Sequence, residues 1–509
     1  MKVLEGIATL VLAAALSPQV RAQFLVPPTT ALRSVMEDPS IQMNMYDFGG
    51  NPAWLHLDRN THGLAVYGTR EAEAGSYHRP FDPGYTTSYQ YFLEGTKQVT
   101  DDQTFRGQFG FRQDFRGDWM WVDAKNSSLR SPFLIADSSS GMTAYRGIVM
   151  DAQYSQTIGG SLLVGVQLDY AVDKGLKEAS PKPTSMNRDL AFAAGSAYRV
   201  SDGVDAGASF RYLDQQEEIT FEADPSALLR ETILYKFRGF DRYIRISKKD
   251  EFRKIQSRGY TGRVHLSLRP GAETMILLYG GGGVLNLDVK DGGTSPSNQG
   301  FYQSDLVETR IKAKHETRGV VLGLTGGFEW ISDWARHPDF NVLLMKGSSA
   351  LCKAALGVEI PEITPYLSLA AEYAFTGDQE ITHDYLSGMD VDITRTGHDL
   401  SIGSRWKLSE RVRAGVFYTF SLHRPGRTSV SVVDPSPFYL QTRSREFDFL
   451  SARALGNSAT LQCEYDSGPL GTVILAARYG MLDVTRSTVF GSANRSLVNI
   501  SLSFRFESI

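Results

Sequence analysis

The sequence predicts an all-β protein, a transmembrane antiparallel up-and-down β-barrel of about 18 strands, with 16 as the alternative count. Three observations lead to this prediction. Apolar and polar residues alternate with period two along nearly all of the chain. Short turns alternate with long polar connections between these segments. The chain ends on an amphipathic strand that carries two phenylalanines near the C-terminus.

The first element predicted is a secretory signal peptide over residues 1–22. Lys2 supplies a positive charge, and residues 7–16 form an apolar core too short to span a bilayer as a helix. We therefore expect export from the cytoplasm and cleavage of this peptide. Residues 23–62 are then expected to form an N-terminal periplasmic or lumenal segment, and residues 63–509 the barrel.

The strands are predicted from segments such as the one in which Leu162, Val164 and Val166 alternate with polar residues that include Gln167 and Asp169. A soluble β-sandwich would show the same period, so the connections decide between the two folds. Tight turns are predicted near residues 101–102, 159–160, 202–203, 270–271, 316–319, 361–364, 409–410 and 468–471. Long connections are predicted over residues 116–144, 173–188, 213–257, 288–305, 376–397 and 423–457.

Short turns on one side and long loops on the other are typical of outer-membrane barrels, whose short turns face the periplasm. Without the turn near residues 316–319 and its partner connection, the count would be 16. A lipid-exposed sheet edge would leave amides unpaired in hydrocarbon, so the sheet is expected to close. The last strand, with Phe504 and Phe506 on its apolar face, is the predicted closing strand.

The composition excludes several classes of protein. The chain is 42% hydrophobic and its net charge is −4, which favours neither disorder nor nucleic-acid binding. Cys352 and Cys463 lie within strand patterns and are interpreted as wall residues rather than a disulfide or a metal pair. The nine histidines show no metal-binding spacing. We expect no catalytic, cofactor-binding or metal-binding residues, and no enzymatic activity.

Basic residues on the polar faces of predicted strands are the candidate lumen residues. They are Arg211, Arg263, His265, Arg310, Lys312 and Lys314, of which the last five are predicted to lie on adjacent strands. Lining a lumen, they would favour anionic solutes. The alternative is that they pair with Glu308 or with loop carboxylates and stabilise the wall.

The connection over residues 213–257 is acidic in its first part and basic in its second. Asp224-Pro225 predicts the start of a short helix over residues 227–235. One hypothesis is that this loop folds into the lumen and narrows it. The alternative is a surface loop whose basic half touches anionic lipopolysaccharide.

Residues 91–212 resemble a family of Bacteroidota outer-membrane barrels of unknown function. The resemblance rests on Leu93-Glu94-Gly95, on the Phe133-Leu134-Ile135-Ala136-Asp137 loop end, and on Pro181-Lys182-Pro183 ahead of Asn187-Arg188-Asp189-Leu190. It implies a fold and a location in the bacterial outer membrane, but it transfers no catalytic residue.

A second resemblance concerns Gly50-Asn51-Pro52-Ala53-Trp54-Leu55. This segment is similar to the Asn-Pro-Ala-Gly-Leu segment of long-chain fatty-acid transporters, although Trp54 replaces the glycine. In that family the N-terminal segment forms a hatch inside the barrel, which implies that Asn51, Pro52 and Trp54 are hatch residues. The alternative is a pre-barrel segment that begins with an Asn-Pro turn.

The predicted function is passage of small or hydrophobic solutes across the bacterial outer membrane, through a channel or transporter barrel. The alternative is a non-conducting structural or interaction barrel of the cell envelope. The expected partners are outer-membrane lipid and lipopolysaccharide, the barrel-assembly machinery and an unidentified solute, with no nucleic acid and no cofactor.

Overall fold

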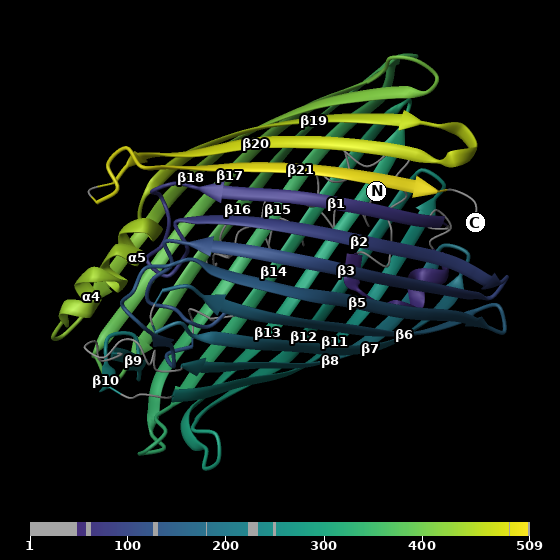
Figure 1. The fold of residues 1–509 in the computed structure, drawn as a ribbon. Helices are drawn as coiled ribbons and strands as arrows, with labels where there is room; N and C mark the ends of the chain where they lie inside the picture. The colour runs from purple at the N-terminus through teal and green to yellow at the C-terminus, as the bar shows by residue number, and fades with distance from the viewer. Residues whose placement is uncertain are drawn as a thin grey trace.

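The computed structural model describes residues 48–57, 63–125, 131–179, 181–221, 233–247, 251–487 and 489–506. The predicted signal peptide and most of residues 23–62 lie outside this part of the chain. Eighteen antiparallel strands form one closed barrel, each paired with its neighbours in the sequence (Figure 1). The predicted fold class is confirmed, and the strand count is 18 rather than 16.

The first half of the barrel wall comprises β1 (Gly63–Ala74), β2 (Tyr85–Thr100), β3 (Gln103–Gly117), β5 (Thr143–Ile158), β6 (Leu162–Lys177), β7 (Thr184–Ser201), β8 (Val204–Phe221), β11 (Glu251–Gly271) and β12 (Thr274–Asp291). The second half comprises β13 (Ser297–Thr317), β14 (Val320–Arg336), β15 (Leu343–Thr364), β16 (Leu367–Asp384), β17 (Met389–Lys407), β18 (Val412–Ser431), β19 (Arg453–Asp466), β20 (Thr472–Arg486) and β21 (Asn494–Phe506).

Six shorter elements lie outside the wall. They are η1 (Pro52–Leu57), β4 (Ile135–Ala136), β9 (Ile233–Phe237), β10 (Tyr243–Ser247), α4 (Pro437–Gln441) and α5 (Arg443–Leu450), with the turn η2 (Gly468–Leu470) between β19 and β20. Strands β10, β9 and β4 form a separate three-stranded sheet. None of the described helices is long and apolar enough to cross a membrane, a finding that concerns helices alone.

The short-turn end of the barrel is present as predicted, although the turns predicted at residues 270–271 and 361–364 lie within β11 and β15. At the opposite end the connections over residues 118–142, 222–250 and 432–452 are long. The long connections predicted over residues 173–188, 288–305 and 376–397 are wrong, because the strands extend and leave only residues 178–183, 292–296 and 385–388.

The turn that decides the strand count is present, because β13 ends at Thr317 and β14 begins at Val320. Several strands run further than the sequence pattern indicates. The connection predicted over residues 213–257 is shorter, since β8 continues to Phe221 and β11 begins at Glu251.

The helix predicted over residues 227–235 is wrong where the structure describes it. Residues 227–232 lie outside the described part, and Ile233 to Tyr235 belong to β9 instead. Strand β9 pairs with β10 on one side and with β4 on the other. These pairings bring together segments far apart in the sequence, and for residues 233–235 they outweigh the local preference for a helix.

The last strand closes the barrel, as predicted. Strand β21 pairs with β1 along its length, with Phe504 opposite Val66 and Phe506 opposite Leu64. Every barrel strand therefore has two neighbours. Closure removes the sheet edges that would expose unpaired amides to lipid.

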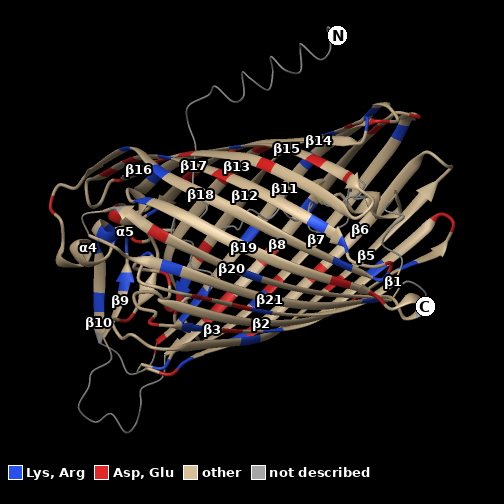
Figure 2. Ribbon diagram, turned by 90° about the horizontal axis from the view of Figure 1, so that it is seen from above, with Lys and Arg blue, Asp and Glu red and all other residues tan. Residues whose placement is uncertain are grey.

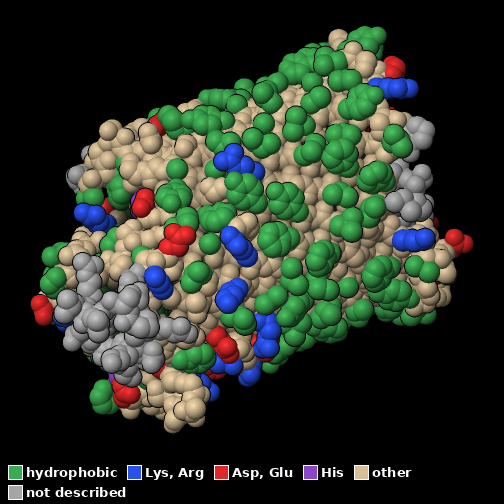
Figure 3. Space-filling model, in the orientation of Figure 1, with side chains coloured by type: hydrophobic (Ala, Val, Ile, Leu, Met, Phe, Trp, Pro, Cys, Tyr) green, Lys and Arg blue, Asp and Glu red, His purple; other side chains and the backbone are tan. Residues whose placement is uncertain are grey.

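The outward face of the wall is apolar over the half that adjoins the short turns. Figure 3 shows hydrophobic side chains over this half of the visible face, whereas charged side chains lie nearer the long loops. Outward-facing residues such as Met150, Leu168, Phe192, Phe210 and Val264 are exposed by 42% to 66%. Because these side chains stand in register on adjoining strands, they form the apolar band that a membrane barrel presents to lipid.

The long loops pack together over one end of the barrel. We define the loop cap as residues 75–84, 118–125, 131–142, 233–247 and 432–452. Its apolar core combines loop residues with wall residues near the ends of β12 to β20. The loop residues of this core include Tyr77, Phe133, Phe240, Tyr439 and Phe449, all of them buried. Helices α4 and α5 lie at the same end of the molecule (Figure 1).

Candidate functional site

The inner face of the wall is polar and carries charges of both signs. Acidic and basic residues are interleaved along the barrel strands rather than gathered on opposite sides (Figure 2). A cavity of about 460 Å³ lies along strands β3, β5, β6, β7 and β8. Its polar lining residues are Arg106, Gln108, Asp151, Gln167, Asp169, Asp189, Arg211 and Gln215. We call this cavity the polar chamber.

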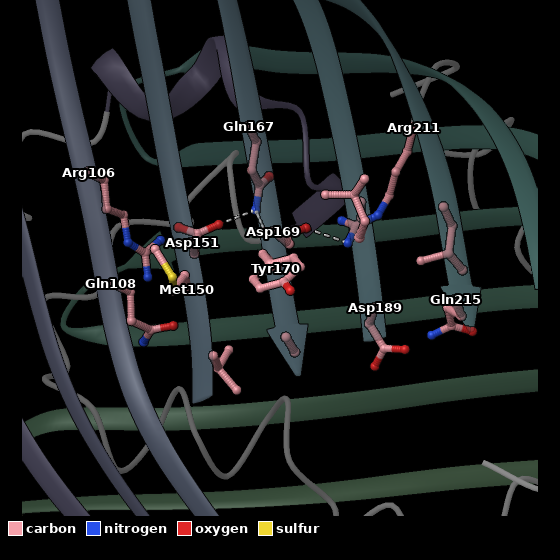
Figure 4. A pocket seen from close by; sticks show the side chains of 15 residues that line it. Arg106, Gln108, Met150, Asp151, Gln167, Asp169, Tyr170, Asp189, Arg211 and Gln215 are labelled. Carbon is pink, nitrogen blue, oxygen red and sulfur yellow. Dashed lines mark hydrogen bonds and ion pairs between the residues drawn. The ribbon is translucent and has the colours of Figure 1, made fainter. Parts of the chain in front are cut away.

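Hydrogen bonds fix the side chains in the centre of the polar chamber (Figure 4). The side-chain Nε2 of Gln167 donates to Oδ2 of Asp151 and to Oδ1 of Asp169, each at 2.8 Å. Arg211 Nη2 lies 2.6 Å from the second oxygen of Asp169. These side chains come from three strands, β5, β6 and β8, which the antiparallel pairing of consecutive strands places near one another.

Of the predicted lumen residues, Arg211 lines the polar chamber and the other five lie nearby on the inner face. Strands β11 and β13 carry these five residues, and they are not adjacent as predicted, because β12 lies between them. Arg310 stands over the ring of Tyr279, 5.8 Å from its centroid. Lys314 lies 4.0 Å from Glu316. Lys312 follows the same inward alternation along β13.

Arg263 reaches across β12 to pair with Glu308 at 2.7 Å. Arg263, Gly281 and Glu308 lie side by side on three neighbouring strands. A Cβ atom on Gly281 would stand 2.7 Å from Arg263 Cγ, so glycine leaves the room that this ion pair needs. For Arg263, the alternative of pairing with Glu308 is therefore the observed arrangement.

The predicted hatch residues lie inside the barrel, near its short-turn end. We call residues 48–57 the lumen segment. Asn51 Nδ2 donates to the carbonyl oxygens of Ser196 at 3.2 Å and of Ala208 at 3.3 Å. Trp54 is 1% exposed, and its ring centroid lies 5.1 Å from that of His265. His265, a predicted lumen residue, is thus covered by this segment.

The wall is shaped to receive the lumen segment. Ser155 Oγ donates to the carbonyl oxygen of Ala53 at 2.7 Å. A Cβ atom on Gly165 would lie 2.4 Å from the carbonyl carbon of Pro52, and one on Gly195 would lie 2.0 Å from Asn51 Oδ1. The two glycines therefore form a groove that a larger side chain would fill.

Buried ion pairs fasten the loop cap to the wall. Lys177 Nζ, at the end of β6, lies 3.1 Å from Asp123 and 2.8 Å from Asp137, both in the cap. Burial is the main cause that raises the pKa of Asp123 to about 8, and the neighbouring Asp137 carboxylate adds to it. Lys236 of the cap pairs with Glu251 at 3.0 Å and with Asp291 at 2.5 Å.

Sequence reasoning missed most of the polar chamber. Asp151 and Asp189 share their faces with small and apolar residues, so neither carboxylate stands out from the alternation of apolar and polar residues along its strand. A usable signal was present in β6, where Gln167, Asp169 and Asp173 are three polar residues on one face. Which other strands complete the site depends on pairing that the sequence does not encode locally.

An apolar outer wall around a polar lumen defines the class: a transmembrane β-barrel with an internal segment and a packed loop cap. The chain belongs to a family of unknown function, DUF6850, whose sequence model matches residues 52–506. No curated protein sequence matches the chain.

Among solved structures, the siderophore receptor PiuA from Acinetobacter baumannii is similar with a TM-score of 0.43 and 8% identity, over 87% of this chain and 82% of that chain. The FrpB iron transporter from Neisseria meningitidis has a TM-score of 0.43 and 11% identity, over 89% and 83%. The CymD monoaromatic hydrocarbon channel has a TM-score of 0.29 and 11% identity, over 92% and 93%. At these identities the likeness concerns the fold alone.

Proposed function

We propose that this protein is a gated transporter of the bacterial outer membrane, in which small solutes pass through the polar chamber. The observation that carries the proposal is the position of the chamber between the lumen segment and the loop cap, inside a barrel with an apolar outer wall. The long loops would face the exterior and the short turns the periplasm, as in other outer-membrane barrels.

Both obstructions are held by noncovalent contacts, which supports movement during transport. The lumen segment is attached by hydrogen bonds to backbone carbonyls and by the packing of Trp54. The loop cap is attached by buried ion pairs and an apolar core. A barrel of this strand number is wide enough for an aqueous lumen once such segments move. The lumen segment would then act as a hatch.

The lining of the polar chamber favours a polar solute over a hydrophobic one. Carboxylate, amide and guanidinium groups line it, and they present both donors and acceptors in fixed positions. An apolar solute would leave these groups without partners, which is costly in a confined site.

A non-conducting envelope barrel is the alternative function. The specific observation that favours it is the size of the apolar core in the loop cap, which packs against most strands of one half of the wall. Such a core would hold the loop cap closed, as expected of loops that bind a partner and do not open to let solutes pass.

Solute flux into proteoliposomes separates the two functions. We expect slow swelling in a small neutral polyol with the wild-type protein, and fast swelling with a Gly195→Val/Lys177→Met variant that loosens both obstructions. A heat-modifiable gel shift would confirm that both proteins are folded barrels. If the folded double variant were as impermeable as empty liposomes, the transport proposal would be wrong.

A further inference from the structure

The outward faces of β5, β6 and β7 carry an unusual charge distribution. On these fully described strands, the outward-facing charged residues are Arg146, Lys174 and Arg188, and no Asp or Glu faces outward. All three side chains are exposed. The carboxylates of the same strands, such as Asp169 and Asp173, belong to the inner face, as their ion pairs with lumen residues show. We call Arg146, Lys174 and Arg188 the basic patch.

The strand register places the three cations close together. Arg146 and Lys174 are direct partners on neighbouring strands. Arg188 lies opposite Val172, one step along the same face from Lys174. Direct cross-strand partners have Cβ atoms about 5 Å apart and diagonal neighbours about 7 to 8 Å. One anionic group of phosphate size can therefore contact two of these side chains at once.

No carboxylate among the described residues forms an ion pair with the basic patch. Arg188 donates to the Gln216 side-chain oxygen at 3.1 Å. Arg146 faces the Gln113 side-chain amide, whose oxygen accepts from Arg146 Nε at 2.8 Å when the amide is turned to satisfy both groups. On the next strand, β8, the outward-facing Asp214 and Glu218 flank Gln216, and they pair with cations of β11 instead of with Arg188. Arg258 lies 3.8 Å from Asp214, and Lys254 lies 3.6 Å from Glu218.

The basic patch lies near the long-loop end of the apolar band, where the outward-facing Leu176 and Met186 follow it. Towards the short turns, the outward-facing residues next to it are Ile148, Val172 and Leu190, and apolar residues continue from there. At about 3.3 Å per residue and a tilt of ~40°, the stretch of β6 from Leu162 to Lys174 spans roughly 30 Å along the membrane normal. This matches the thickness of the hydrocarbon core, so Lys174 falls at the headgroup level of the outer leaflet.

We propose that the basic patch binds the phosphate of a phosphorylated glycolipid in the outer leaflet. Cations without an acidic partner at a lipid boundary require a counter-ion. A guanidinium beside an ammonium can donate several hydrogen bonds to the oxygens of one phosphate. The inference rests on the proposed placement in the outer membrane, with the long loops outward.

This site differs from the lipid contact that the sequence suggested. The basic half of the connection over residues 213–257 was the contact considered there, as the alternative to a loop that narrows the lumen. In the structure, Arg253 of that half is 1% exposed and pairs with Asp291 at 2.7 Å. Lys254 pairs with Glu218. Arg253 and Lys254 are therefore engaged by the protein itself, whereas Arg245 of the same half is exposed.

Native mass spectrometry of the purified full-length protein with phosphorylated lipid A, and with the same lipid after removal of its phosphates, tests the proposal. We expect the wild-type protein to bind the phosphorylated lipid about tenfold more tightly than the dephosphorylated one. An Arg146→Gln/Lys174→Gln variant should lose this preference. The matched control Arg258→Gln, on an outward-facing cation that has an acidic partner, should keep it.

Equal binding of the two lipids by the wild-type protein, or an equal loss in the control variant, would overturn the proposal. Inorganic phosphate at millimolar concentration should not displace the lipid; full displacement would indicate a site for the free ion instead. The basic patch lies outside the lumen, so the Arg146→Gln/Lys174→Gln variant should show wild-type behaviour in the swelling assay. Failure of lipid binding and failure of transport are thus separate results.

Discussion

Lys177 holds two carboxylates of the loop cap in a site that is closed to water. It is 2% exposed, and Asp123 and Asp137 are 5% and 1% exposed. Removing one partner from a buried ionic cluster leaves uncompensated charge, which costs far more than the loss of a surface pair. The side chain that fastens the cap therefore lies in the wall and not in the cap itself.

We predict that Lys177→Met lowers the free energy of local unfolding of the cap by about 3 kcal/mol. Amide hydrogen exchange over residues 131–142 measures this change. The matched control is Lys407→Met, because Lys407 pairs with Glu410 at 2.7 Å but both side chains are exposed. Its effect should stay below about 1 kcal/mol. Equal effects of the two substitutions would mean that the buried cluster does not hold the cap.

The surroundings of Arg263 show which properties of a single residue can be predicted from the sequence. Alternation placed Arg263 on a polar face, and Glu308 was named as its alternative partner. The role of Gly281 between them was not predictable, because it depends on the register of three strands. Residue identity predicts the face that a side chain occupies, whereas its partner follows from pairing across the sheet.

The lumen segment is the element on which gating depends. It contacts β5, β6 and β7, and its fit depends on the two glycines of the groove. The Asn-Pro-Ala sequence indicated a hatch through a resemblance. No sequence pattern indicated that Gly165 and Gly195 would receive it, because isolated strand glycines have several other causes.

We predict that Gly195→Val displaces the lumen segment while the barrel still forms. A valine side chain would occupy the position of Asn51 Oδ1, which lies 2.0 Å from the place of a Cβ atom. Amide exchange over residues 48–57 should increase at least tenfold, since those amides lose their protected surroundings. Gly323→Val is the control, because a Cβ atom on Gly323 meets nothing within 4 Å. Unchanged protection in Gly195→Val would refute the proposed groove.

Elements with local signals were predicted well, and elements that depend on distant contacts were not. Most tight turns were found because glycine, aspartate and proline mark them within a few residues, but those predicted at residues 270–271 and 361–364 lie within β11 and β15. Strand β9 was taken for the end of a helix, since its partners β4 and β10 come from other parts of the loops. The extra length of β8 and β11 was missed because polar residues there face outward beyond the apolar band.

At the scale of the whole molecule, closure of the sheet creates both the lumen and the membrane surface. The polar chamber exists only because five neighbouring strands curve around it, and the loop cap and lumen segment bound it along the barrel axis. The sequence predicted the barrel and its strand number. It did not predict a lumen that is partly filled from both ends, because the filling depends on where loops fold in three dimensions.

Single-channel conductance of the Gly195→Val/Lys177→Met variant in a planar bilayer tests whether solutes pass through the polar chamber. We predict discrete conductance steps, and a shift of the reversal potential towards anions when Asp189→Asn removes one chamber carboxylate. Asp305→Asn, on the outward face of β13, should leave the reversal potential unchanged. Silence from the folded double variant, or no shift with Asp189→Asn, would contradict passage of solutes through the polar chamber.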